Sequence, residues 1–259
     1  MTLHHELAGQ HNAPCIVLST SLGARLQMWQ PQMQALTQHF RVLRYDMRGH
    51  GASPSPAGPY SIADLGNDVL QLLDHHNICS VHFCGISLGG VIGQWLGIHA
   101  SDRVEKLILC NTAAKVGTEE GWQKRIAEVR ANGMASIADT VISRWFTEPF
   151  ATSHPQVIAS IREGMLASNV EGYAACCEAL RTSDLRNEVA TITTPTLVIA
   201  GSHDAVCTTA DAQFLQSQIP NSQQQILPAA HLSNVEAADL FNQSLLNFLL
   251  QEPVQTISQ

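Results

Sequence analysis

The stretch GISLG, residues 85–89, places a serine between two glycines. Gly85 stands two residues before Ser87, and Gly89 stands two residues after it. This G-x-S-x-G spacing is typical of a sharp turn that presents a serine hydroxyl for attack on a carbonyl carbon. The two glycines leave the room that so tight a turn requires, because they carry no side chain. We therefore interpret Ser87 as the candidate nucleophile of an acyl-transfer reaction.

A serine hydroxyl becomes a strong nucleophile only when a neighbouring base accepts its proton. Asp204 and His231 each follow an apolar run, and they come after the serine in the order acid, then histidine. That chain order is the one expected for a nucleophile of this type. We predict that His231 is the general base and that Asp204 holds its imidazole in the required tautomer. His203 is a weaker alternative for the base, and Asp184 is a weaker alternative for the acid.

Attack on a carbonyl creates an oxyanion, which needs N–H donors fixed around it. The N–H of Leu88 is the first predicted donor, because it directly follows the nucleophile at the start of a predicted helix. The second donor is expected from the loop after an early apolar run, and Leu22 is the predicted residue. Leu22 and Leu88 would act through their backbone N–H groups alone.

The elements that must position these residues alternate between strand and helix patterns. Amphipathic patterns over 61–77, 88–99 and 235–249 predict helices, and Ser61 with Asp64 three residues later predicts a capped helix start. Such alternation predicts an α/β fold with a mostly parallel sheet flanked by helices. The carboxyl ends of parallel strands gather at one edge, which is where the candidate residues would meet. Apolar runs predict strands at 15–20, 40–46, 80–85, 104–111, 195–201 and 222–228.

The alternation is interrupted between about residues 114 and 185, where only helical patterns occur. We predict a helical cap over 115–184, inserted into a core made of residues 1–114 and 185–259. Arginine and lysine side chains of this cap are the candidate partners for an anionic group on a substrate.

Composition excludes several classes of protein. The chain has 259 residues and a formal net charge of −8, and it lacks the basic stripe that nucleic-acid binding requires. The first residues do not have the pattern of a secretory signal, and no apolar run is long enough to cross a membrane, so we expect a cytoplasmic protein. Seven scattered cysteines lack the spacing of a metal site, and we expect neither a metal nor a cofactor. The oligomeric state is left open.

Longer stretches around the candidate residues resemble the 3-oxoadipate enol-lactonases of the α/β-hydrolase family. The resemblance implies the α/β-hydrolase fold and a Ser–His–Asp mechanism through a covalent acyl-enzyme. It also implies hydrolysis of a small-molecule enol-lactone to 3-oxoadipate in the catabolism of aromatic compounds. The similar stretches run nearly end to end and include RVLRYDMRGHGAS, HFCGISLGGVIGQWLG, LILCNTAAKVGT, EGYAACCEALR and AAHLSNVEAADLFN.

The substrate implied by this resemblance carries a carboxylate, which needs a cation or several N–H donors. Among the cations of the cap we predict Arg130 and Arg144 as its partners, with Trp145 as an apolar wall of the binding site. Solvated arginines and a core tryptophan are an equally good interpretation of these residues. The same triad would also serve a carboxylesterase, a carbon–carbon bond hydrolase or a perhydrolase, and the fold could serve a non-catalytic receptor for small ligands.

Overall fold

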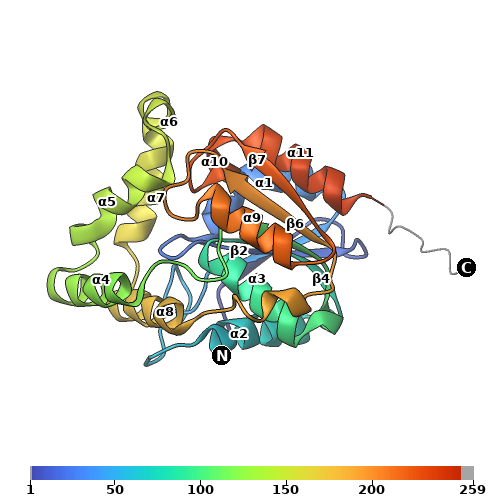
Figure 1. The fold of residues 1–259 in the computed structure, drawn as a ribbon, viewed down its shortest axis with the longest axis horizontal. Coiled ribbons are helices and arrows are strands. Elements are labelled where there is room, and N and C mark those ends of the chain that lie inside the picture. The colour runs from blue at the N-terminus through green and yellow to red at the C-terminus, as the bar shows by residue number, and fades with distance from the viewer. Residues whose placement is uncertain (1, 252–259) are drawn as a thin grey trace, which may run out of the picture.

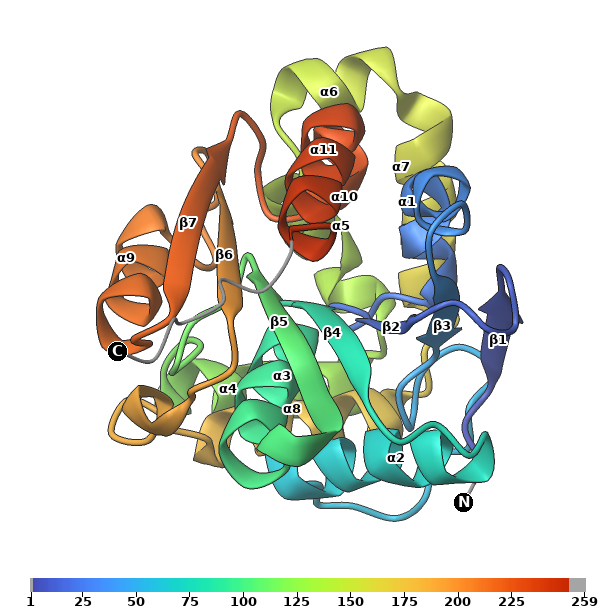
Figure 2. The ribbon, with the colours of Figure 1, turned by 90° about the vertical axis from the view of Figure 1, so that its right-hand side faces the viewer.

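The computed structural model describes residues 2–251, and a seven-stranded sheet runs through their centre (Figures 1 and 2). The strand order is β1-β3-β2-β4-β5-β6-β7, with β1 antiparallel to β3 and every other neighbouring pair parallel. This is the predicted α/β fold with a mostly parallel sheet. The strands are β1 (His5–Ala8), β2 (Cys15–Ser19), β3 (Arg41–Tyr45), β4 (Val81–Ile86), β5 (Val104–Cys110), β6 (Thr196–Gly201) and β7 (Ser222–Leu227).

All six predicted strands form, in the predicted order along the chain. β2, β4 and β6 are buried at every position, because helices cover both faces of the sheet. Strands in that environment show continuous apolar runs instead of alternation. The seventh strand, β1, was not predicted, because its four residues HELA are short, partly exposed and half polar. Its pairing with β3 joins residues that lie far apart in the sequence, such as His5 and Tyr45.

Helices cover the two faces of the sheet (Figure 2). The helix start predicted at Ser61 is confirmed. The Ser61 hydroxyl accepts from Asp64 N–H, while the Asp64 carboxylate accepts from Ser61 N–H. The helix predicted over 235–249 is instead two helices, because the chain leaves helical geometry at Ala237. Within residues 2–251, no helix combines the length and apolar character needed to cross a membrane. The core helices are α1 (Gln30–Leu36), α2 (Ile62–His75), α3 (Leu88–His99), α9 (Thr209–Gln218), α10 (Ser233–Glu236) and α11 (Ala238–Leu249).

Five helices between β5 and β6 lie to one side of the sheet (Figure 1). The chain leaves and rejoins the core at neighbouring points, since Leu185 N–H donates to the Ala114 carbonyl at 2.9 Å. Lys115 and Asp184 form an ion pair at 3.3 Å beside it. These contacts support our proposal that residues 115–184 form the cap. Its helices are α4 (Glu119–Asn132), α5 (Ala135–Trp145), α6 (Glu148–Ser153), α7 (Pro155–Leu166) and α8 (Val170–Thr182).

Helix α3 crosses the ends of β2 and β5 at unusually close range. A Cβ at Gly89 would lie 2.5 Å from the Ser19 carbonyl oxygen, and a Cβ at Gly90 would lie 2.6 Å from the Thr112 side chain. Only glycine fits at such separations, because a methyl group there would overlap atoms that are already in contact. The N-terminal end of α3 is therefore fixed directly above the carboxyl ends of the strands.

Gly89→Ala is expected to lower the free energy of unfolding by about 2–3 kcal/mol, because the new Cβ would meet the Ser19 backbone, which cannot rotate away. Gly121→Ala is the control, since a Cβ in that exposed first turn of α4 meets only Thr118 Oγ1 at 3.1 Å. Urea unfolding followed by circular dichroism measures both variants. Equal midpoints for Gly89→Ala and the wild type would contradict the close approach of α3.

Candidate active site

Ser87 lies at the turn between β4 and α3 and has strained backbone angles. Its φ of 56° and ψ of −116° fall outside the regions that residues with side chains normally occupy. Ser87 N–H donates to the Cys110 carbonyl at 3.0 Å, and its own carbonyl accepts from Thr112 Oγ1 at 2.8 Å. A Cβ at Gly85 would collide with the Gly89 backbone, so the two glycines are needed for this turn. The end of β5 therefore holds the strained serine in one conformation.

Asp204 and His231 form a buried pair at the carboxyl ends of β6 and β7. His231 Nδ1 lies 2.8 Å from Asp204 Oδ2, and both side chains are almost inaccessible to solvent. Burial alone would raise the pKa of Asp204, but the neighbouring His231 and the hydrogen bonds from Asn111 and from Val206 N–H bring it below its usual range. Asp204 is therefore a carboxylate, and Nδ1 of His231 carries the proton. This leaves Nε2 of His231 as the nitrogen that can accept a proton.

Asn111 joins the acid to the histidine loop, and sequence reasoning did not identify it. It follows β5, and its Nδ2 donates to Asp204 Oδ2 at 3.0 Å and to the Ala230 carbonyl at 3.1 Å. Its Oδ1 accepts from Ser233 Oγ at 2.5 Å. One side chain at the end of β5 thus holds two later segments, the loop of Asp204 and the loop of His231. Its position directly after a strand, like that of Ser87, was the available signal.

Val206 and Cys207 complete the surroundings of the acid. Both backbone N–H groups donate to Asp204 Oδ1, at 2.7 and 3.0 Å. The carboxylate therefore accepts four hydrogen bonds, one from His231, one from Asn111 and two from the backbone. A buried carboxylate with this many donors is held in one orientation, which in turn orients the imidazole.

The two predicted oxyanion donors lie on segments that contact each other. Gly89 N–H donates to the Thr20 carbonyl at 3.1 Å, which joins the start of α3 to the loop that carries Leu22. Within residues 2–251, neither Leu22 N–H nor Leu88 N–H has a hydrogen-bond acceptor. A tetrahedral oxyanion needs N–H groups that are free of other acceptors, so Leu22 and Leu88 stay the predicted donors.

The weaker candidates from the sequence lie elsewhere. His203 is at the surface and interacts with the Ser202 hydroxyl at 3.0 Å. Asp184 is held by Arg186 at 2.6 Å, in addition to its pair with Lys115. The contacts of both residues are thus with neighbours other than Ser87. Among residues 2–251, no group of three or more His, Cys, Asp and Glu side chains is arranged to hold a metal ion.

A cavity of about 330 Å³ lies between the cap and the loop that follows Asp204. Val206, which donates to the Asp204 carboxylate, lines it. Trp145 also lines it, and the Trp145 carbonyl accepts from Leu232 N–H at 3.0 Å, one residue after His231. The cavity is therefore built on residues that adjoin both members of the buried pair. Its cap residues include Trp122, Arg125, Val141, Arg144 and Trp145.

The three predicted substrate-binding residues do not lie together. Arg144 and Trp145 line the cavity, whereas Arg130 is exposed and forms a bidentate pair with Glu171 at 3.0 Å. The structure therefore does not bring Arg130 to this cavity. Arg125 does line it, with its guanidinium 5.6 Å from the Trp122 ring and 3.5 Å from Tyr173 Oη. The spacing of Trp122 and Arg125, three residues apart on one helix face, was the signal for this contact.

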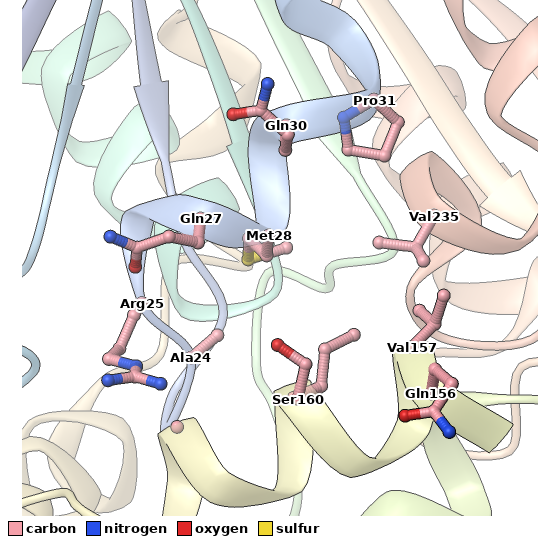
Figure 3. A pocket seen from close by; sticks show the side chains of 12 residues that line it. Ala24, Arg25, Gln27, Met28, Gln30, Pro31, Gln156, Val157, Ser160 and Val235 are labelled. Atoms are coloured by element: carbon pink, nitrogen blue, oxygen red, sulfur yellow. The ribbon is translucent and has the colours of Figure 1, made fainter.

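A second cavity, of about 510 Å³, lies between α7 and the segment from Ala24 to Pro31 (Figure 3). Its lining is mostly apolar and includes Met28, with Val235 on the side of the histidine loop (Figure 3). Arg25 lies at one end, against Gly164 of α7, where a Cβ would stand 2.7 Å from Arg25 Nε. Arg25 forms no ion pair within residues 2–251. The search for cations in the cap missed it because it belongs to the core.

Comparison with known proteins gives consistent similarities along the whole chain. Residues 14–238 match the α/β hydrolase fold family. The chain is 44% identical to 3-oxoadipate enol-lactonase 2 of Acinetobacter baylyi, over 95% of this chain and 92% of that protein. It is 33% identical to a putative carbamate hydrolase RutD of Variovorax paradoxus, over 96% of each chain. The crystal structure of the enol-lactonase from Burkholderia xenovorans LB400 superposes with a TM-score of 0.95, at 46% identity and 96% coverage of both chains.

Asn111→Leu is expected to lower the free energy of unfolding by about 1–3 kcal/mol at neutral pH, because it leaves a buried carboxylate short of a donor. The hydrogen bond helps to depress the pKa of Asp204 in the folded state, so its contribution exists above about pH 4 and is lost as pH falls through the folded pKa. The difference between variant and wild type should therefore be constant from pH 7 to about pH 4 and shrink as the pH falls further. Urea unfolding from pH 7 to below pH 4 measures it, and a difference that grows in acid would contradict the assigned bond.

Proposed function

Because the chain belongs to the α/β-hydrolase fold family, we propose that it hydrolyses 3-oxoadipate enol-lactone to 3-oxoadipate, a step in the β-ketoadipate pathway of aromatic catabolism. The observation that carries the proposal is the 46% identity to an enol-lactonase of known structure over 96% of both chains. A likeness confined to the sheet and its loops would support only the shared catalytic frame. This one also spans the cap, whose residues line both cavities.

In the proposed mechanism, Ser87 Oγ adds to the lactone carbonyl carbon as His231 Nε2 accepts its proton. Asp204 stabilises the resulting imidazolium through Nδ1. The negative charge that develops on the carbonyl oxygen is met by the N–H groups of Leu22 and Leu88. Their lack of other acceptors within the described residues supports this role, since no existing hydrogen bond must break first.

Collapse of the tetrahedral intermediate breaks the bond between the acyl carbon and the ring oxygen. The leaving group is an enol oxygen, which departs more readily than an alkoxide. His231 supplies its proton, and the enol then converts to the ketone of 3-oxoadipate. A water molecule, deprotonated by His231, attacks the acyl-enzyme and releases the carboxylate from Ser87. Every proton transfer therefore passes through the one imidazole that Asp204 orients.

The free carboxylate of the lactone would be bound in the cavity beside Val206. Arg125 and Arg144 supply cations there, and Trp145 supplies an apolar wall. Neither arginine has an ion-pair partner within residues 2–251, so binding a carboxylate would not require an existing pair to separate. Arg130 lacks this property because Glu171 already neutralises it.

Ser87→Ala is expected to lower kcat for the enol-lactone by at least about 10⁴-fold, because no acyl-enzyme can form. The loss of lactone absorbance measures turnover, with Ser143→Ala as the control for an exposed serine of the cap. Mass spectrometry of the wild type after rapid quenching should show the acyl adduct on Ser87. Lactone hydrolysis by Ser87→Ala near the wild-type rate would reject the covalent mechanism, and turnover of a simple aryl ester but not the lactone would favour a carboxylesterase.

Arg144→Met and Arg125→Met are each expected to raise KM for the enol-lactone by about tenfold and to leave KM for a neutral ester unchanged. Arg130→Met is the matched control, because it removes a cap arginine that is already paired with Glu171. Steady-state kinetics on both substrates provides the test. If only Arg25→Met raised KM for the lactone, the carboxylate would lie in the cavity of Figure 3 instead.

A further inference from the structure

Two hydrogen bonds join the loop that carries Leu22 to the loop after β3. Gly23 N–H donates to His50 Nε2 at 2.9 Å, and Leu26 N–H donates to Asp46 Oδ1 at 2.8 Å. Gly23 directly follows Leu22, so His50 acts on the peptide unit that joins the two residues. His50 itself is 1% exposed and has no part in the triad.

The partners of His50 define which of its nitrogens carries the proton. Nε2 faces an N–H group that can only donate, so Nε2 must be the unprotonated nitrogen. Nδ1 then carries the proton, and it lies 3.2 Å from the Arg48 carbonyl, which can accept it. Only the neutral imidazole satisfies both contacts. A protonated His50 would direct an N–H at the Gly23 N–H, and the two donors would repel each other.

The bond from Gly23 fixes the orientation of the Leu22–Gly23 peptide. Gly23 has a φ of 83°, in the region open to glycine, so its backbone does little to hold that peptide by itself. If the peptide rotated, the Leu22 carbonyl oxygen could turn toward the oxyanion that Leu22 N–H is proposed to stabilise. A carbonyl dipole pointing there would oppose the developing negative charge. The acceptor at His50 prevents that rotation.

We propose that His50 is a positioning residue for the oxyanion hole, acting through the Gly23 amide to keep the Leu22 carbonyl turned away from the oxyanion that Leu22 N–H stabilises. This inference rests on the proposed acyl transfer at Ser87, although it does not depend on which ester or lactone is the substrate. It also makes the oxyanion hole sensitive to acid, because one proton on His50 converts the acceptor into a donor.

The groups around His50 favour its neutral form at physiological pH. Burial lowers the pKa of the imidazole, and this outweighs the Arg48 carbonyl and the charge of Asp46, which raise it. On the side that faces the cap, the centre of the Tyr173 ring lies 6.2 Å from the centre of the His50 ring. Arg125 donates to the Tyr173 hydroxyl. Protonation of His50 therefore requires a pH below the usual pKa range of histidine. Activity should be lost as the pH falls through the lowered pKa of His50. The neighbouring ionisable groups are Asp46 and Arg48 on its own loop, His4 beside Asp46, Tyr173 and Cys176 on α8, and Arg125 on α4.

The central test compares His50→Leu, which removes the acceptor, with His50→Gln, whose Oε1 can reach the position of Nε2. His50→Leu is expected to lower kcat about 10- to 100-fold with KM within threefold of the wild type, and His50→Gln should recover most of kcat. His82→Leu is the control, because His82 is also buried but lies at the opposite end of β4 from Ser87. Both 3-oxoadipate enol-lactone and 4-nitrophenyl acetate are assayed.

Binding of butylboronic acid separates a positioning role from a merely structural one. The boronate forms a tetrahedral adduct with the serine and occupies the oxyanion hole, so its Ki should rise in His50→Leu by the same factor as kcat falls. Wild-type kcat and Ki in His50→Leu would overturn the proposal, and so would a lower kcat with unchanged Ki. If the wild type hydrolysed the ester but not the lactone, the proposed lactonase function would be rejected. The kinetics on the ester would still test the role of His50.

The pH profile of His50→Gln provides a test that does not require His50→Leu to fold. In the wild type, protonation of His50 should add to the fall of kcat/KM in acid. In His50→Gln that proton is absent, so the acid limb should depend on one proton fewer and become less steep. An acid limb of unchanged steepness in His50→Gln would overturn the role assigned to His50.

Discussion

Helix α3 approaches the sheet so closely that neither Gly85 nor Gly89 has room for a Cβ, and the geometry of the site depends on that approach. It brings the Ser87 turn onto the end of β5, where Cys110 and Thr112 hold its backbone. It also brings the start of α3 against the loop after β2. The strained φ of Ser87 is tolerated because the surrounding contacts leave no other conformation. The proposed nucleophile and the proposed oxyanion donors thus depend on one packing contact, that of α3 with the sheet.

The loop of the base depends on the cap as well as on the core. The Glu236 carboxylate accepts from Ala230 N–H at 2.9 Å, and it also accepts from the N–H and the hydroxyl of Thr147 at the start of α6. The Trp145 carbonyl accepts from Leu232 N–H on the other side of His231. Contacts to the cap therefore hold the chain on both sides of His231, at Ala230 and at Leu232. Asn111, which belongs to the core, holds Asp204. The proposed binding of substrate in the cap and the proposed proton transfer at His231 would therefore depend on the same contacts.

Sequence patterns predicted the elements whose signals are local. Runs that are mostly rich in Val, Ile and Leu identified the six parallel strands, and the spacing of Ser61 and Asp64 identified a helix start, because both signals depend on neighbouring residues. Ser87, Asp204 and His231 could be predicted as a set because each follows a predicted strand and their order along the chain is typical of a serine nucleophile. Asn111 also follows a strand, but that position alone does not predict its contact with Asp204. β1 was not predicted either. Both depend on hydrogen bonds with residues far along the chain.

The choice among cap arginines shows where a sequence stops being informative. Arg125 and Arg130 lie on the same helix, and composition gives no reason to prefer one. What separates them is the partner that the fold supplies: Glu171 neutralises Arg130, whereas Arg125 meets only the uncharged ring of Trp122 and hydroxyl of Tyr173. An arginine left without a counter-charge beside a cavity still has its charge available for an anion. The property that selects Arg125 is therefore the absence of a tertiary ion pair within the described chain, which no local pattern encodes.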